Sequence, residues 1–170
     1  MGRKVANHNS KELRNHNNNN TKPPPSCNCQ KSKVHECPIP GACNVDGAIY
    51  QAKVTTSDGK TESYVGLARN FKKRYSKHKR TLKNRNADGQ TTLSNYVWDR
   101  RDRQLNPIVT WSYLEKQVPD YNPVSGKCKL CTREKFQIVL NPSVASLNQR
   151  TEMFASCRHK ESYLLGDPPD

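Results

Sequence analysis

The sequence contains no long apolar run and comparatively few acidic residues. No stretch approaches the roughly 20 consecutive apolar residues that a membrane-spanning helix requires, and no apolar segment follows the N-terminal charges as it does in a secretory signal. We therefore expect an intracellular protein, nuclear or cytoplasmic. Only 15 Asp and Glu oppose 29 Lys and Arg, so the net charge is +14. Such an excess indicates a polyanionic partner, either nucleic acid or an anionic membrane surface.

Apolar residues are also scarce in residues 1–36, where an asparagine and histidine stretch is followed by Pro23-Pro24-Pro25. A segment with so little to bury cannot offset the entropy that it would lose on ordering. We expect residues 1–36 to be a disordered basic tail. The composition changes at Cys37, and residues 37–165 fit one domain, because a single core usually takes roughly 100 to 200 residues.

Strand and helix signals alternate along the predicted domain. Ser57-Asp58-Gly59 is a hairpin signal between two strands, Asn70 and Thr91 or Thr92 are helix N-caps, and Asn141-Pro142 ends the last helix. The predicted elements are strands at 48–54 and 63–67, helices at 71–84 and 92–103, a strand at 108–114 and a helix at 130–140. A Pro and Gly loop is expected at 121–127. This order predicts a mixed α/β (α+β) domain, with a small antiparallel three-stranded sheet flanked by helices.

The first helix carries two groups of cations. At about 100° per residue, with Phe71 as origin, Tyr75 falls at about 40° and Leu82 at about 20°, which defines the buried stripe. Arg74 at about 300° and His78 at about 340° border this stripe and point back towards the strands. The other cations spread over the solvent arc, where they suit phosphate contacts or plain solubility. These candidate DNA-binding residues are Lys72, Lys73, Lys77, Lys79, Arg80 and Lys83.

Tyr50 and Tyr64 lie on the two paired strands, fourteen residues apart. Tyrosine is common in strands, so the pair alone means little. Together with Arg74 and His78, however, the segments Ala48-Ile49-Tyr50 and Tyr64-Val65-Gly66 resemble the core of the GIY-YIG nucleases. Ala48 stands where the name-giving motif has glycine.

Further segments narrow the resemblance to the endonuclease domain of Penelope-like retroelements. They are Cys37 with Cys43, Leu93-Ser94 with Trp98, Cys128 to Cys131 leading to Glu134, Leu147 to Arg150, and Cys157-Arg158-His159. The resemblance covers residues 37 to about 160. It implies a metal-dependent DNA endonuclease that leaves a 3′-hydroxyl for target-primed integration, with DNA and a reverse transcriptase with its RNA as partners. The sequence contains no reverse transcriptase, which fits either a C-terminal piece or a solitary copy.

The resemblance also assigns roles to the matched residues. Glu134 would hold Mg²⁺ or Mn²⁺, hard cations that prefer carboxylate and phosphate oxygens; the alternative is a solvent-facing helix glutamate. Arg74 would stabilise charge on the phosphoryl oxygens, or form only a salt bridge. Tyr50 would act as the base or position the water, and Tyr64 would bond the water or the phosphate.

Two further roles remain open between chemistry and structure. A phenol has a pKa of about 10 and is a poor base at neutral pH, so His78 is the natural group to take the proton onward. His78 is otherwise a histidine at the edge of the buried face, or a zinc ligand. Asn148 would close the site through a phosphate or indirect contact, or else act as a helix cap.

Seven cysteines in a reducing compartment indicate thiols or metal ligands rather than disulfides. The preferred structural zinc site combines two close pairs that bracket the helix of Glu134. Its ligands are Cys128, Cys131, Cys157 and His159.

A rival zinc site uses Cys37 and Cys43, completed by His78, His159 or the later cysteines. Unliganded buried thiols are the third alternative. Cys27 and Cys29 lie in the polar tail and are expected to take no part in the fold.

Residues 69–85 contain nine Lys and Arg and no acidic residue. The segment predicts salt-dependent binding to the DNA backbone rather than to a membrane. Neither a recognition helix nor an aromatic base-reading series is visible. The second hypothesis is a non-catalytic, zinc-stabilised nucleic-acid-binding module from a decayed element, in which only binding persists. A repair or restriction nuclease is a third, which leaves the cysteines unexplained.

Overall fold

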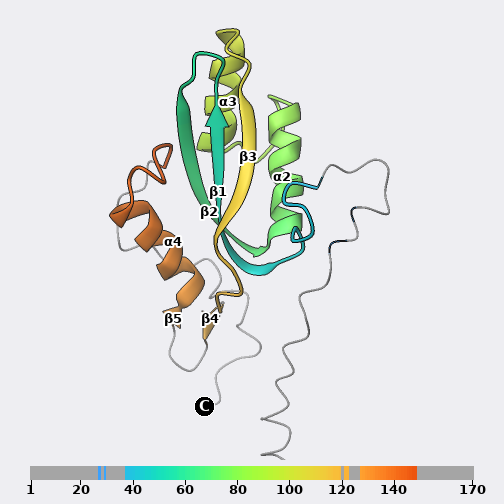
Figure 1. The fold of residues 1–170 in the computed structure, drawn as a ribbon. Coiled ribbons are helices and arrows are strands. Elements are labelled where there is room, and N and C mark those ends of the chain that lie inside the picture. Colours follow the sequence, from blue (N-terminus) through green and yellow to red (C-terminus); the bar gives the residue numbers. More distant parts are fainter. Residues whose placement is uncertain (1–26, 28, 30–36, 120, 123–126, 149–170) are drawn as a thin grey trace, which may run out of the picture.

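A computed structural model of the chain describes residues 27, 29, 37–119, 121–122 and 127–148. In this part of the chain, a three-stranded antiparallel sheet with the order β2-β1-β3 is flanked by three helices (Figure 1). The strands are β1 (Asp46–Thr55), β2 (Thr61–Asn70) and β3 (Ile108–Glu115). The helices are α2 (Phe71–Lys83), α3 (Thr92–Asp102) and α4 (Lys129–Leu140). The mixed α/β class with its small antiparallel sheet is confirmed.

One element differs from the expectation. Within the segment predicted to be a loop, β4 (Tyr121–Asn122) pairs with β5 (Lys127–Cys128) in a short antiparallel ladder. So short a ladder leaves no alternating pattern in the sequence. Of the helices in the described ranges, none has the length and apolar character needed to cross a bilayer.

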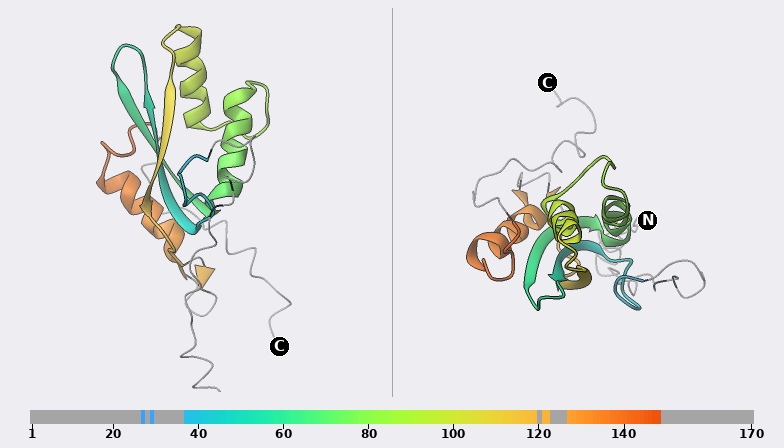
Figure 2. Two further views of the ribbon diagram at one scale, coloured as in Figure 1. Left: turned by 45° about the vertical axis from the view of Figure 1, so that its right-hand side comes forward. Right: turned by 90° about the horizontal axis from the view of Figure 1, so that it is seen from above.

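The central strand β1 is covered on both faces (Figure 2). Ala48, Tyr50, Ala52 and Val54 face α2 and α3, because alternate side chains of a strand point to the same side. Ile49 points the other way and packs in the layer beneath α4. Two apolar layers therefore share one sheet, and each layer is completed by residues from a different part of the sequence.

Local capping fixes where the helices begin. The side chain of Asn70 accepts a bond from the backbone N–H of Lys73 at 3.0 Å, as an N-cap does. Thr91 and Ser94 form a capping box at the start of α3. The indole N–H of Trp98 donates to the carbonyl of Thr81 at 2.9 Å, which ties α3 to α2.

The buried stripe of α2 differs from the predicted one. Phe71, His78 and Thr81 are its buried residues, whereas Tyr75 and Leu82 are half-buried. His78 therefore lies in the middle of the buried face, not at its edge. The polar Thr81 can be buried because its hydroxyl donates to the carbonyl of His78 at 3.0 Å.

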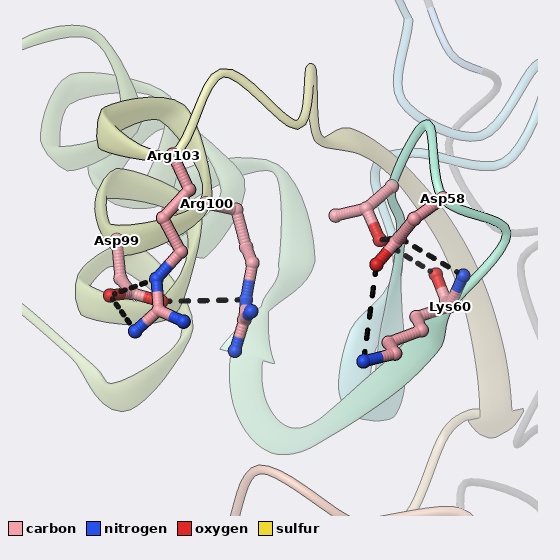
Figure 3. A network of polar contacts seen from close by, with 6 residues as sticks. Asp58, Lys60, Asp99, Arg100 and Arg103 are labelled. Carbon is pink, nitrogen blue, oxygen red and sulfur yellow. Dashed lines mark hydrogen bonds and ion pairs between the residues drawn. The ribbon is translucent and has the colours of Figure 1, made fainter.

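Surface ion pairs contribute little to this fold. Asp99 pairs with Arg103 at 3.0 Å and with Arg100 at 3.4 Å, and Asp58 lies 4.0 Å from Lys60 at the hairpin tip (Figure 3). Pairs of such exposure are usually worth about 0 to 1 kcal/mol. The packing of the two layers on the sheet is the larger contribution.

Gly47 is required where the segment after β3 crosses the start of β1. Its φ is +60°, and a Cβ there would lie 2.2 Å from the carbonyl oxygen of Val118. The N–H of Val118 in turn donates to the carbonyl of Gly47 at 2.8 Å.

Replacing Gly47 by alanine should lower the free energy of unfolding by about 2 to 5 kcal/mol, from backbone strain and overlap with Val118. Gly59→Ala is the matched control, since Gly59 has a φ of +79° and open space around it. It should cost only about 1 to 2 kcal/mol. Equal losses in urea denaturation of the two variants would contradict the close approach of Val118.

Candidate functional site

Tyr50 lies across the neighbouring strand. It is fully buried on β1, directly opposite Gly66 of β2. A Cβ on Gly66 would lie 2.5 Å from the hydroxyl oxygen of Tyr50, closer than packed heavy atoms can approach. The missing side chain therefore makes room for the phenol, whose hydroxyl extends over the edge strand β2.

The hydroxyl of Tyr50 is held between two residues of α2. It lies 2.7 Å from Nε2 of His78, and the Nε–H of Arg74 donates to its oxygen at 3.2 Å. Because Arg74 is the donor in one of these bonds, the Tyr50 hydroxyl donates the other hydrogen bond to Nε2 of His78. The imidazole proton then lies on Nδ1. Arg74 and His78 are one helical turn apart, so both reach the same atom.

Burial sets the protonation of this group. It raises the pKa of Tyr50, an effect to which the neighbouring Tyr64 adds. Burial and the charge of Arg74 together lower the pKa of His78 to about 3. Near neutral pH the pair is therefore a neutral phenol that donates to a neutral imidazole.

Tyr64 completes the cluster from β2. Its ring centroid lies 6.5 Å from that of Tyr50 and 6.0 Å from that of His78. Burial alone would lower the pKa of Arg74, but the phenols of Tyr50 and Tyr64 raise it. Three of the predicted site residues, Tyr50, Tyr64 and His78, thus meet around the guanidinium of a fourth, Arg74, which remains charged.

Glu134 approaches from α4, the helix on the other face of the sheet. On an ideal helix it lies about 40° from both Leu130 and Ile138, which are buried in the α4 layer. Glu134 is half-buried beside this stripe rather than fully exposed on the outer face of α4. The pKa of Tyr50 is raised mainly by burial and by Tyr64, and the charge of Glu134 raises it further. A half-buried carboxylate that acts on this phenol suits a hard divalent cation.

Asn148 supports the edge of β2. Its amide N–H donates to the carbonyl of Val65, and its amide oxygen accepts the N–H of Val65, both at 2.8 Å. Leu147 and Ser146 likewise bond the backbone of Ser63. Asn148 is therefore neither a helix cap nor directed to a ligand by these atoms. It holds the backbone on one side of Tyr64.

Trp111 is a site residue that the sequence patterns do not identify. It lies on β3, with ring centroids 5.3 Å from His78 and 5.8 Å from Tyr50. The half-buried alternate residues of β3 include Val109 and Tyr113 beside it. This alternation was the available signal, and it turns the Trp111 ring towards those of His78 and Tyr50.

The predicted phosphate-binding cations remain on the outer side of α2. Lys73, Lys77, Arg80 and Lys83 are exposed, and Lys72 and Lys79 are half-buried. Arg80 donates to the carbonyl of Asp88 at 2.9 Å, which closes the loop after the helix. The exposed cations therefore lie on the helix that also carries Arg74.

Four cysteines meet at the start of the domain. The Sγ atoms of Cys27, Cys29, Cys37 and Cys43 all lie within 4.8 Å of one another, with the closest pairs at 3.0 to 3.4 Å. These separations are too long for disulfides. They bracket the sulfur spacing of about 3.8 Å that follows from Zn–S bonds in a tetrahedral site. This cluster could bind a metal such as zinc.

The thiols differ in their protonation. Burial raises the pKa of Cys43 and that of Cys37, whereas the bond with Cys43 lowers the pKa of Cys27 to about 6. The prediction that Cys27 and Cys29 take no part in the fold is wrong. Of the rival zinc set, Cys37 and Cys43 are together as predicted, but their partners are these two cysteines. His78 is bonded to Tyr50 instead.

The cysteine cluster is tied to the aromatic site. The hydroxyl of Tyr113 donates to the carbonyl of Ala42 at 2.7 Å, and the N–H of Phe71 donates to the carbonyl of Val45 at 2.9 Å. Phe71 packs between Tyr113 and Tyr50, with ring centroids at 5.0 and 5.2 Å. The segment that carries Cys43 thereby positions the first residue of the helix that holds Arg74 and His78.

The preferred zinc set is only partly described. Cys128 is the N-cap of α4, where its Sγ accepts the N–H of Cys131 at 3.4 Å. Cys157 and His159 lie outside the described residues. Comparison of the chain with protein-family models, with curated proteins and with solved structures finds no match.

Removing one thiol of the four-cysteine cluster should remove one equivalent of bound zinc. We expect Cys43→Ser to carry one zinc per chain fewer than the wild type, because three thiolates hold the ion less tightly than four. Elemental analysis of the dialysed proteins measures this. Cys131→Ser tests the other predicted set independently. Equal zinc content in the wild type and Cys43→Ser would contradict metal binding at the cluster.

The buried His78 should make the fold sensitive to acid. Unfolded histidine binds a proton below pH about 6.5, but folded His78 does so only near pH 3. Stability should therefore be complete above pH 6.5 and fall as the pH drops, by at most about 1.4 kcal/mol per pH unit from this residue. The measurement is urea denaturation of wild type and His78→Gln between pH 7 and 4.5. If wild type and His78→Gln lose stability in parallel as the pH falls, His78 is not buried in its neutral form beside the charged Arg74.

Proposed function

We propose that this chain is a metal-dependent DNA endonuclease with the GIY-YIG fold, akin to the endonuclease domain of Penelope-like retroelements. The observation that carries the proposal is the Tyr50 hydroxyl, held over Gly66 between His78 and Arg74. Burying a phenol, an imidazole and a guanidinium together is costly for a purely structural cluster. Their convergence suits hydrolysis of a phosphodiester bond.

Arg74 supplies positive charge for the phosphoryl group. Its guanidinium is partly buried, so its field is screened less than that of a surface cation. As water attacks the phosphorus, negative charge grows on the non-bridging oxygens, and a fixed donor stabilises it. Tyr64, whose phenol also acts on this guanidinium, positions the water or the phosphate.

Tyr50 and His78 provide a route for the proton of the attacking water. Tyr50 accepts that proton as it passes its own to Nε2 of His78, so the phenol ends neutral and the imidazole becomes charged. Before DNA binds, Arg74 disfavours a charged His78. An anionic phosphate beside Arg74 offsets this effect and makes His78 a stronger base.

Glu134 would hold the catalytic Mg²⁺ or Mn²⁺, which supplies Lewis-acid polarisation of the phosphate. Its half-buried carboxylate already acts on Tyr50. Zinc at the four-cysteine cluster would have a different task. It would fix the segment before β1 and, through Phe71, the start of α2.

The outer cations of α2 would bind the DNA backbone. In the described part of the chain, Lys73, Lys77, Lys79 and Lys83 form no ion pair. They can therefore contact phosphates without first breaking a salt bridge, which favours sequence-independent, salt-dependent binding. A 3′-hydroxyl left by the cut would serve as a primer for reverse transcription in retroelement integration.

The test is nicking of supercoiled plasmid with Mg²⁺ or Mn²⁺. Tyr50→Phe, Arg74→Ala and Glu134→Gln should each slow nicking by about 100-fold or more, since each removes a group used in the transition state. Gly66→Ala should do the same by displacing the Tyr50 hydroxyl. Arg103→Ala and Glu62→Gln are matched controls that should retain activity.

Nicking that survives in all four site variants would contradict the proposal. Salt-sensitive DNA binding without nicking by the wild type would instead support a non-catalytic, zinc-stabilised binding module. Circular dichroism of each variant separates lost chemistry from lost folding.

A further inference from the structure

Lys135 is a buried cation without a counter-charge in the described part of the chain. The residue is 8% exposed, and its Nζ is buried and makes no hydrogen bond. Several other cations of the fold are paired with carboxylates. Arg133 on the same helix lies 3.7 Å from Glu115, and Arg100 and Arg103 pair with Asp99 (Figure 3).

An uncompensated ammonium group is expensive to keep in a buried position. It loses hydration and gains neither a hydrogen bond nor an ion pair in return, so its burial is unfavourable. A leucine or methionine would fill the same space without this cost. Such a group is therefore better explained by a ligand that it receives than by the stability of the fold.

The position of Lys135 on α4 indicates where that ligand would bind. With Glu134 as origin, Gln137 and Arg133 fall about 60° and 100° to one side of an ideal helix, and Lys135 falls about 100° to the other. Arg133 and Gln137 both contact Glu115, the last residue of β3. Lys135 is therefore on the opposite flank, towards β2, because the strand order is β2-β1-β3.

The β2 side is also the edge of the sheet towards which the Tyr50 hydroxyl extends, from the face that α2 covers. The phenol crosses β2 over Gly66, and α4 packs on β2 through the layer that contains Val65. Glu134 and Lys135 are adjacent in sequence, one on the buried stripe and one at its β2 side. The carboxylate of Glu134, which suits a cation, and the ammonium group of Lys135, which suits an anion, therefore come from neighbouring positions at this edge of the sheet.

We propose that Lys135 forms a phosphate subsite next to Glu134. Its ammonium group receives a non-bridging oxygen of a phosphate, which replaces the hydration lost on burial. The inference deepens the proposed nuclease function and rests on it for the identity of the ligand as a nucleic-acid phosphodiester. The same chemistry would accept free inorganic phosphate, so the two sources are tested separately.

The experiment compares wild type, Lys135→Met and Lys129→Met, whose lysine is exposed on the same helix. Thermal unfolding is measured in chloride, with inorganic phosphate, and with a short DNA duplex in the absence of added divalent metal. Without a ligand, Lys135→Met should be as stable as wild type or more stable. In this variant, stabilisation by phosphate should be lost and stabilisation by duplex should be reduced, with duplex affinity at least about 10-fold lower. Lys129→Met should respond as wild type does.

If only the duplex stabilises the wild type, the subsite is assigned to nucleic acid. If only inorganic phosphate stabilises it, the subsite is assigned to the free anion. Either result, when it is weakened in Lys135→Met, supports an anion site at Lys135. Equal ligand responses in wild type and Lys135→Met overturn it. If the methionine variant does not fold, Lys135→Gln decides by the same comparison. These readouts need no cleavage, so a protein that nicks DNA but shows no effect of Lys135 refutes only the subsite. An effect of Lys135 without nicking refutes only the nuclease.

Discussion

The hydrogen bond from the Tyr50 hydroxyl to His78 is the constraint on which the site depends. It requires three things at once: pairing of Tyr50 with Gly66, the missing side chain at Gly66, and an α2 that begins immediately after β2. A shift of one residue in the strand pairing would turn Tyr50 to the α4 face. The register of the sheet therefore determines, through the bonds of Tyr50 to α2, where His78 and Arg74 lie.

The four cysteines and the aromatic residues hold the segment before β1 against the site, which matters in a small domain. In the described residues, a three-stranded sheet, a two-stranded ladder and three short helices bury a modest core, and such domains often use a metal to order their loops. Here the cysteine segment bonds to Phe71 and Tyr113, which pack next to Tyr50. A metal bound by the four cysteines would thereby be coupled to the site geometry through backbone bonds and ring contacts, rather than through a shared ligand.

Sequence patterns located the three helices and the three strands of the larger sheet to within a few residues but missed β4 and β5, and helical periodicity correctly turned Arg74 towards the strands. They misplaced His78, because the stripe was defined by Phe71, Tyr75 and Leu82, two of which are only half-buried. A buried histidine and a buried Thr81 are not expected from hydrophobicity. Each is permitted by a specific hydrogen-bond partner that lies in the tertiary structure or one turn away. The role of Asn148 as a support for β2 could not be seen for the same reason.

The sequence by itself determined the order of elements, their caps and the charge of the outer face of α2, since these depend on neighbours within a few residues. Tertiary structure decided which cysteines meet, where Trp111 packs, and that Lys135 is buried without a partner in the described residues. These outcomes depend on contacts between distant segments. The separation of two segments along the chain does not reveal whether they meet, because closing a longer loop costs only slightly more entropy than closing a shorter one. Polar, cysteine-containing segments such as that of Cys27 and Cys29 consequently look like solvated chain until their partners are known.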